Sequence, residues 1–275
     1  MRLSVIFSTY KSPAWLEKTF WGFLEQSHRE FEIIVADDGS GDKTRELVDQ
    51  YREHFAAIGV GLRHEWQADE GFRKCRILNR AIVAASSDYL VFTDGDCICR
   101  RDYLATHAAR AERGYYLSGS YFKLPMETSL AIRREDVAEQ RCFDWNWLRA
   151  NGLPKSAKRS KIATGPGRAK WMNRLTPTAC NLKGSNASAW REDLLAVGGF
   201  DERMRWGGLD RELGVRLQNR GIRARHVRYD AICVHLDHAR GYKDPEMVRA
   251  NKELRLNVAR TGTTRTDYGI EAEHV

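Results

Sequence analysis

Two aspartates one residue apart are the side chains in this sequence best suited to hold a metal ion. Asp94 and Asp96 follow the apolar, strand-like residues 89–93 and are separated by one glycine. Carboxylates at a strand end can share Mg²⁺ or Mn²⁺, whose other coordination positions suit phosphate oxygens. Asp-Gly-Asp is also good turn sequence, and without its context a surface turn explains it better. The preceding strand favours a site for a metal diphosphate.

Polar residues also end the two strands predicted at the start of the chain. The first of these ends in Ser8 and Thr9, and the second, residues 31–36, runs straight into Asp37 and Asp38. Predicted helices alternate with the strands, which is typical of a parallel sheet covered by helices on both faces. Ligands of such sheets bind beyond the carboxyl ends of the strands. Alone, Asp37 and Asp38 fit a turn that caps the next helix, but together the clusters predict one ligand site.

Cations surround the start of the helix predicted over residues 75–85. Arg73 and Arg76 could pair with a base or a diphosphate, because a guanidinium can bind two oxygen atoms of an oxyanion at once. A solvated helix face is the simpler explanation for such charges, and it is our interpretation of Lys74.

The composition bounds the class of protein and its partners. The chain has 275 residues, of which 42% are hydrophobic, and this suits one domain with a sizeable core. A formal net charge of +8 indicates an anionic partner, such as a nucleic acid, a phosphorylated small molecule or an acidic membrane. Six cysteines without framework spacing, and a beginning without signal-peptide features, predict a reduced, cytoplasmic location.

Much of the positive charge lies in one segment. Residues 155–174 carry seven Lys or Arg and no acidic residue, with Gly-Pro-Gly in their middle. We predict a mobile loop here. It binds either an anionic acceptor molecule or the inner face of a membrane, or it is simply a solvated loop.

The order of these clusters resembles that of a family 2 inverting glycosyltransferase with the GT-A fold. Three segments of the second half are similar to motifs of β-1,4-galactosyltransferase-like and chondroitin-polymerase-like enzymes. They are residues 184–193, 198–202 and 206–212. The resemblance covers roughly residues 3–238 and implies an α/β fold. In it, a Rossmann-like nucleotide-binding half, residues 1–120, continues into an elaborated acceptor-binding half, residues 121–275, within one domain.

Carried over to this chain, the resemblance implies a site for a UDP-sugar and a divalent metal ion, Mn²⁺ or Mg²⁺. Its donor-binding residues would be Ser8, Thr9, Asp37, Asp38, Arg73, Asp94 and Asp96. Thr9, Asp37 and Arg73 would contact the uridine, and Asp94 would lie near the ribose.

A histidine near the end of the matched region completes the metal site in several relatives. His235 has this place, and His238 is a weaker candidate. A lone histidine on a strand is more often a core residue than a ligand, and packing is the better explanation for Cys97 and Cys99. The resemblance therefore implies Asp96 and His235 as metal ligands.

Asp210 falls where the family places its catalytic base. An acceptor hydroxyl has a pKa far above neutrality, so a carboxylate must take its proton as it attacks. Attack opposite the leaving group inverts the anomeric carbon, and an α-linked donor then gives a β-linked product. The alternative for Asp210 is a helix N-cap. Leu209 departs from the family, which usually has an acidic residue there, and this puts one acceptor contact in doubt.

Residues before Asp210 are predicted to touch the acceptor. Trp206 can stack on a sugar ring, and Gly207 and Gly208 let the backbone approach a sugar closely. Asn186 is a further predicted acceptor contact. Most of the other tryptophans are better explained as core residues.

Together these residues predict an inverting glycosyltransferase. We expect it to transfer a hexose or N-acetylhexosamine from a UDP-sugar to a hydroxyl of a bacterial surface glycan or glycolipid, of the lipopolysaccharide or capsule type. A sugar nucleotidyltransferase is the nearest alternative, but it usually begins with a glycine-rich loop and a lysine, and residues 8–12 lack glycine. A nucleic-acid-binding protein fits worse, because carboxylate clusters repel phosphate unless a metal intervenes.

Overall fold

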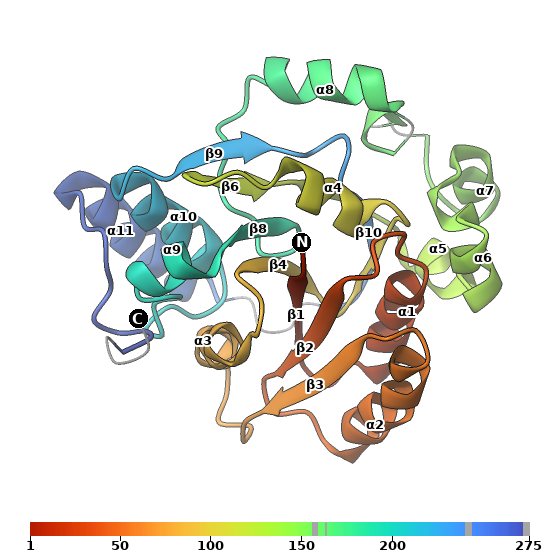
Figure 1. Ribbon diagram of the computed structural model, residues 1–275, viewed down its shortest axis with the longest axis horizontal. Coiled ribbons are helices and arrows are strands. Elements are labelled where there is room, and N and C mark those ends of the chain that lie inside the picture. Colours follow the sequence, from red (N-terminus) through yellow and green to blue (C-terminus); the bar gives the residue numbers. More distant parts are fainter. Residues whose placement is uncertain (156–158, 163, 240–243, 272–275) are drawn as a thin grey trace.

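The computed structural model describes residues 1–155, 159–162, 164–239 and 244–271. Its centre is a seven-stranded mixed sheet, and a three-stranded sheet lies beside it (Figure 1). In spatial order the large sheet contains β3 (Gly61–Trp66), β2 (Phe31–Asp37), β1 (Leu3–Thr9), β4 (Tyr89–Asp94), β8 (Ala187–Trp190), β6 (Tyr115–Ser118) and β9 (Arg223–His226). The small sheet contains β5 (Cys97–Cys99), β10 (Ile232–His235) and β7 (Ser120–Lys123).

The strands β3, β2, β1 and β4 are parallel, as the sequence predicts. Every residue of β1 and β2 is buried, which explains why both are largely apolar in sequence. The register places Ser8 beside Asp94, and Thr9 beside Asp37. The polar clusters that end these strands therefore lie along one edge of the sheet.

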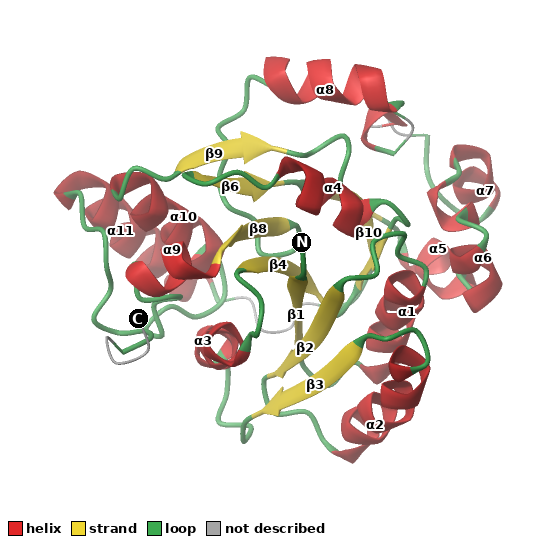
Figure 2. Ribbon diagram, in the orientation of Figure 1, coloured by secondary structure: helices red, strands yellow, loops and turns green. Residues whose placement is uncertain are grey.

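Two groups of helices cover the two faces of the large sheet (Figure 2). One group consists of α1 (Pro13–Leu24), α2 (Asp42–Ala56) and α4 (Tyr103–Arg110). The other consists of α3 (Lys74–Ala84), α9 (Arg191–Ala196) and α10 (Leu209–Asn219). In α1, Leu16, Phe20 and Phe23 are spaced by three and four residues and are completely buried, so they form its inner face. The predicted α/β architecture is confirmed.

The large sheet continues into the second half of the chain. Strand β8 pairs antiparallel with β4 and with β6, and β6 pairs parallel with β9. Strands β6 and β7 are separated only by Gly119, yet they belong to different sheets. A side chain at Gly119 would collide with the Asn186 amide, so glycine is required at this close approach.

The small sheet brings the end of β10 to the end of β4. Strand β10 is antiparallel to β5, with His235 opposite Cys97, and the backbone N–H of Leu236 donates to the Asp96 carbonyl at 2.9 Å. The chain between β7 and β8 adds helices that the sequence analysis did not predict. These are α5 (Met126–Ala131), α6 (Arg134–Ala138) and α7 (Trp145–Ala150). Helices α6 and α7 share a third core with β10.

The basic segment predicted as a mobile loop is partly helical. Helix α8 spans Pro166–Leu175 and follows a 3-10 turn at Arg159–Lys161, whereas residues 156–158 and 163 lie outside the described residues. The proline of Gly-Pro-Gly begins a helix because its fixed φ suits a first turn. In the described part of the chain, α8 and the other helices are all too short or too polar to cross a membrane.

The polar segment after Thr261 packs against the body of the protein as far as Ile270. It follows α11 (Pro245–Thr261). The backbone N–H of Ile270 donates to the Gly198 carbonyl at 2.8 Å, and Ile270 is only 5% exposed. Arg265 also donates to the Leu195 carbonyl, and the buried Thr266 hydroxyl donates to the Asp201 carboxylate, so polar and apolar contacts together hold this segment.

Helix α10 carries an ion pair that is completely buried. The Nε and Nη2 atoms of Arg216 each lie 2.7 Å from a carboxylate oxygen of Glu212, one turn earlier. Arg216 also donates to the carbonyl of Val197. Each charge is tolerated in the core only while its partner is present. The pair thereby holds the first turn of α10 against the end of α9.

Glu212→Ala is expected to lower the free energy of unfolding by about 3–5 kcal/mol, because it leaves the Arg216 guanidinium buried without its counter-ion. Urea unfolding followed by circular dichroism measures this change. The matched control is Glu253→Ala at an exposed position of α11, which should alter the free energy by less than about 0.5 kcal/mol. Equal losses in the two variants would contradict the structural role of the pair.

Candidate active site

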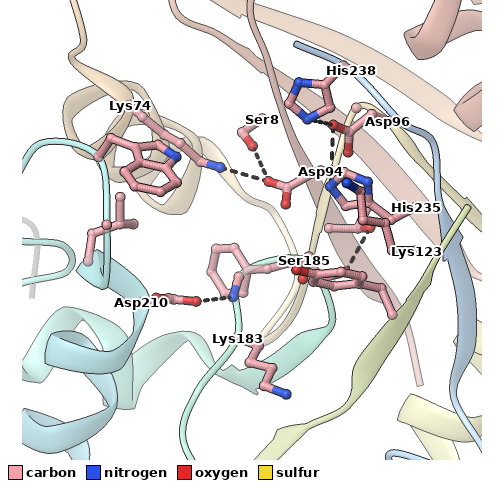
Figure 3. A pocket seen from close by; sticks show the side chains of 18 of the residues that line it. Ser8, Lys74, Asp94, Asp96, Lys123, Lys183, Ser185, Asp210, His235 and His238 are labelled. Atoms are coloured by element: carbon pink, nitrogen blue, oxygen red, sulfur yellow. Dashed lines mark hydrogen bonds and ion pairs between the residues drawn. The ribbon is translucent and has the colours of Figure 1, made fainter. Parts of the chain in front are cut away.

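A cavity of about 1550 Å³ lies beyond the carboxyl ends of β1 and β4 (Figure 3). Both halves of the chain line it. The predicted site residues on its wall are Ser8, Thr9, Asp38, Asp94, Asp96, Trp206, Gly207, Gly208, Asp210 and His235. Three other predicted residues, Asp37, Arg73 and Asn186, lie elsewhere in the described structure.

Lys74 is a site residue that the sequence analysis misinterpreted. Its Nζ lies 2.7 Å from Asp94 Oδ1, and the Ser8 hydroxyl donates to the same oxygen at 2.7 Å. Burial alone would lower the pKa of Lys74, but the charges of Asp94, Asp96 and Asp210 outweigh it and raise this pKa above its usual range. Lys74 is therefore a charged group on the cavity wall, and its interpretation as part of a solvated helix face is wrong. Lys74 is the first residue of α3, and this position next to the strand ends is the feature of the sequence that could have indicated its role.

Asp38 is held in position from two sides. Its Oδ1 accepts a hydrogen bond from Gln67 Nε2 at 2.6 Å, and its Oδ2 accepts one from the backbone N–H of Arg73 at 3.0 Å. Burial raises the pKa of Asp38, and these two hydrogen bonds partly oppose that shift. Beside it, Thr9 Oγ1 is a buried hydroxyl without a hydrogen-bond partner in the described structure.

Asp37 and Arg73, which the resemblance assigns to the uridine, are not among the residues that line this cavity. Asp37 is completely buried, where its carboxylate accepts from the backbone N–H of Ser40 at 2.8 Å and lies 2.9 Å from His64 Nε2. Arg73 pairs with Glu70 at 2.7 Å and lines a separate cavity of about 350 Å³. Asp37 thus fixes a turn, and only the backbone of Arg73 serves the main cavity.

Three side chains offer metal-ligand atoms that all lie within 4.8 Å of one another. They belong to Asp96, His235 and His238. Asp96 Oδ2 is 3.1 Å from His238 Nε2 and 3.7 Å from His235 Nε2. A carboxylate with two imidazoles suits Mn²⁺ better than Mg²⁺, which prefers oxygen ligands. His238, the weaker candidate in the sequence, lies closer to Asp96 than His235 does.

Backbone carbonyls orient both imidazoles toward Asp96. His235 Nδ1 lies 2.6 Å from the Leu236 carbonyl, and His238 Nδ1 lies 2.8 Å from the Ala239 carbonyl. A carbonyl only accepts, so each Nδ1 donates, and Nε2 of a neutral ring then carries a lone pair. Two lone pairs facing the Asp96 carboxylate repel it, and a cation among them removes the repulsion. The three residues therefore fit a divalent metal ion.

Asp210 lies in the first turn of α10 on the cavity wall. It accepts hydrogen bonds from the backbone N–H groups of Gly184 at 3.1 Å and Arg211 at 2.9 Å. Burial raises the pKa of Asp210 above the usual range of an aspartate, although these hydrogen bonds and Lys74 oppose the shift. The N-cap of α10 is Gly208, so the alternative of a capping aspartate is wrong. A raised pKa suits a group that must accept a proton.

Trp206, Gly207 and Gly208 lead into Asp210 along the cavity wall. The two glycines have φ of +106° and +85°, in the left-handed region that other residues rarely adopt. This turn therefore requires glycine at both positions. Leu209, at the family's acidic position, is only 9% exposed and joins the apolar core under α10.

Asn186, which was predicted to contact the acceptor together with Trp206, Gly207 and Gly208, does not line the cavity. It is completely buried, and its Nδ2 donates to the carbonyls of Ser120 at 2.9 Å and Ala231 at 2.8 Å. Its Oδ1 lies 3.2 Å from His107 Nε2. A side chain enclosed in this way links the two sheets and cannot touch an acceptor.

Cations from the second half of the chain line the rest of the cavity. They are Lys123, Lys161, Lys183, Arg211, Lys252 and Arg255. Burial lowers the pKa of Lys183, and the neighbouring charges of Arg228 and Arg211 lower it further. The cavity thus combines a carboxylate-rich strand edge with a cation-rich wall, and an anion on that wall would relieve the repulsion between its cations.

We expect the protein to bind Mn²⁺ without any substrate, and His235→Ala and His238→Ala each to weaken this binding at least about tenfold. The loss of one imidazole leaves the remaining ligands too few to replace the water shell of the ion. Electron paramagnetic resonance of free Mn²⁺ during a titration measures the affinity. The control is His54→Ala, an exposed histidine on α2. If both site variants bind Mn²⁺ as tightly as the wild type does, the two histidines are not metal ligands.

Comparison with known proteins identifies relatives of this chain. Glycosyl transferase family 2 matches residues 4–175. Validoxylamine A glucosyltransferase from Streptomyces hygroscopicus subsp. jinggangensis (strain 5008) is 30% identical over 234 residues, which cover 80% of this chain and 52% of that protein. The chain therefore spans about half the length of this relative.

Two solved structures are similar in fold. Residues 1–349 of S. aureus TarS in complex with UDP-GlcNAc match with a TM-score of 0.63 at 17% identity, covering 100% of this chain and 69% of that one. The mannosyltransferase PcManGT from Pyrobaculum calidifontis, in complex with GDP-Man and Mn²⁺, matches with a TM-score of 0.58 at 21% identity, covering 95% of this chain and 73% of that one. At these identities the likeness concerns the fold alone.

Proposed function

Because the chain belongs to glycosyl transferase family 2 and has the GT-A fold, we propose that it is an inverting, metal-dependent glycosyltransferase. It transfers a hexose or N-acetylhexosamine from a UDP-sugar to a hydroxyl of a bacterial surface glycan or glycolipid, of the lipopolysaccharide or capsule type. The observation that carries this proposal is the shared cavity, in which Asp94, Asp96 and Lys74 share one space with Asp210 (Figure 3).

The nucleoside of the donor binds at the strand ends in this proposal. Asp38 accepts the imide N–H of uracil, and the unpartnered Thr9 hydroxyl gains a hydrogen bond from the nucleotide. Ser8 and Lys74 both occupy Oδ1 of Asp94, so Oδ2 can accept from a ribose hydroxyl.

The diphosphate binds between Lys74 and the three side chains that fit a metal ion. Asp96, His235 and His238 would hold a divalent cation, which when bound stabilises the charge that develops on the leaving diphosphate. Lys74 adds a fixed positive charge there, because the surrounding carboxylates keep it protonated. A preorganised cation needs no reorientation during the reaction, which is why it favours the transition state.

Asp210 acts as the general base. It takes the proton of the acceptor hydroxyl as that oxygen attacks the anomeric carbon and the bond to the diphosphate oxygen breaks. Burial supports this role, because it brings the pKa of Asp210 closer to neutrality, where a base both is deprotonated and holds a proton well. Attack from the side opposite the diphosphate inverts the anomeric carbon.

The acceptor is anionic in this proposal. The cations on the cavity wall, including Lys183 and Arg211 beside the base, favour a phosphate or carboxylate near the attacking hydroxyl. Trp206 offers a face on which a sugar ring can stack, and the turn at Gly207 and Gly208 leaves room for it.

A screen of UDP-sugars with Mn²⁺ and no acceptor tests the reaction class. One donor should be hydrolysed slowly with release of UDP, because water can replace the acceptor in an assembled site. The alternative of a sugar nucleotidyltransferase predicts pyrophosphate as the product. Tight binding of another nucleotide, with no UDP released from any donor, would falsify the uridine assignment.

Asp210→Asn is expected to lower kcat by about 10²–10⁴-fold while leaving UDP affinity unchanged, because only proton transfer is lost. In the wild type, kcat should fall as the pH drops through the raised pKa of Asp210, since the protonated form cannot act as a base. Initial rates and UDP titrations from pH 4 to 8 (roughly the range of a perturbed aspartate) measure both effects. Asp267→Asn, at an exposed position, is the control. A loss confined to UDP affinity would instead mean a binding role.

A further inference from the structure

Helix α8 carries two large apolar side chains on its outer face. Trp171 is 64% exposed and Leu175 is 69% exposed, and a spacing of four residues puts them on the same side of the helix. Figure 1 shows α8 at the periphery of the molecule, beyond β9. Single exposed apolar residues are ordinary, whereas two adjacent ones on a surface helix form an apolar patch.

Positive charges flank this apolar pair on both sides. At 3.6 residues per turn, Arg168 lies on one side of Trp171 and Leu175, and Lys170 and Arg174 lie on the other. All three cations are exposed. The outer face of α8 therefore has an apolar centre and basic borders, and residues 155–174 contain no acid to offset them.

The inner face of α8 is fixed to the protein. Ala169 is 1% exposed, and Met172 contacts the Thr164 hydroxyl. Asn173 Nδ2 donates to the Asp230 carboxylate, and Asn173 Oδ1 accepts from the backbone N–H of Tyr229 at 3.1 Å. These contacts set the rotation of α8 about its axis, so the same side chains always face outward.

We propose that the outer face of α8 docks on an anionic phospholipid surface. A basic helix with tryptophan and leucine on one face lies in the plane of a bilayer interface, with its apolar residues at the acyl boundary and its cations at the headgroups. Anionic headgroups attract the Lys and Arg residues further. A soluble polyanion would engage the cations and leave Trp171 and Leu175 in water. A second copy of this chain would present the same positive charge and repel it.

Docking has a consequence for the cavity. Lys161, five residues before α8, lines it. A docked α8 therefore holds the cation-rich wall close to the lipid surface, where a lipid-linked acceptor would be presented. This consequence rests on the proposed function, whereas the docking itself does not.

Co-sedimentation with vesicles tests the docking. The wild-type protein should bind vesicles of phosphatidylcholine with roughly a third phosphatidylglycerol, fail to bind pure phosphatidylcholine, and lose binding as salt rises. Arg168→Gln/Lys170→Gln/Arg174→Gln should weaken binding at least about tenfold, because three cations leave the interface. Trp171→Ala/Leu175→Ala should also weaken it about tenfold, because insertion at the acyl boundary is lost.

A matched control separates α8 from overall charge. Lys43→Gln/Arg45→Gln/Arg52→Gln on α2 removes the same charge from another exposed helix and should bind vesicles as the wild type does. Circular dichroism and thermal unfolding establish that each variant folds. UDP release without acceptor should be equal in all of them, so a failure of docking is distinguishable from a failure of the proposed reaction. Undiminished vesicle binding by both α8 variants, or equal binding to neutral vesicles, would overturn the proposal.

Discussion

Carboxylates crowd the carboxyl ends of β1 and β4, and they can remain charged together only with cations among them. Asp38, Asp94, Asp96 and Asp210 line the same cavity. Among the described residues, Lys74 supplies a cation at this edge, and its pKa stays high because three of these carboxylates outweigh its burial. The same ion pair lowers the pKa of Asp94 against the opposing effect of burial. Asp96 instead faces two histidines, so this part of the site suits a cation from outside.

The rest of the fold can be understood as the means of assembling that edge. The parallel register of β1 and β4 sets Ser8 beside Asp94. The small sheet then carries His235 to Asp96, and the left-handed turn at Gly207 and Gly208 starts α10 with Asp210 on the cavity wall. In the proposed function, residues from the first half bind the donor, and residues from the second half supply the base and the two histidines beside Asp96.

Much of this arrangement could be predicted from the sequence, because strand ends and their order determine which residues meet. The predictions that did not match the structure were those that depended on the direction in which a single side chain points. Asp37 and Asp38 are adjacent, so their side chains point in opposite directions, one into the core and one into the cavity. The sequence does not indicate which of the two faces the cavity. Lys74 and Arg73 are also adjacent, and only the packing of α3 decides that the lysine faces Asp94 while the arginine pairs with Glu70.

The helices between β7 and β8 were not predicted for a different reason, since they are short and held by tertiary contacts. Strand β8 has only four residues, so its backbone hydrogen bonds alone do not fix its register against the neighbouring strands. Ser188 bonds both Tyr89 and His107, each at 2.8 Å, and Asn186 bonds the carbonyls between the sheets. Burial lowers the pKa of His107 to about 4, so the ring stays neutral near pH 7 and this network persists.

The same network bears on catalysis through the backbone. Gly184, whose N–H donates to Asp210, lies two residues before Asn186 in the chain. A shift of Asn186 would therefore move the hydrogen bond that orients the proposed base. The asparagine that resembled an acceptor contact in sequence is completely buried between the two sheets, and we interpret it as a positioning residue for the proposed base.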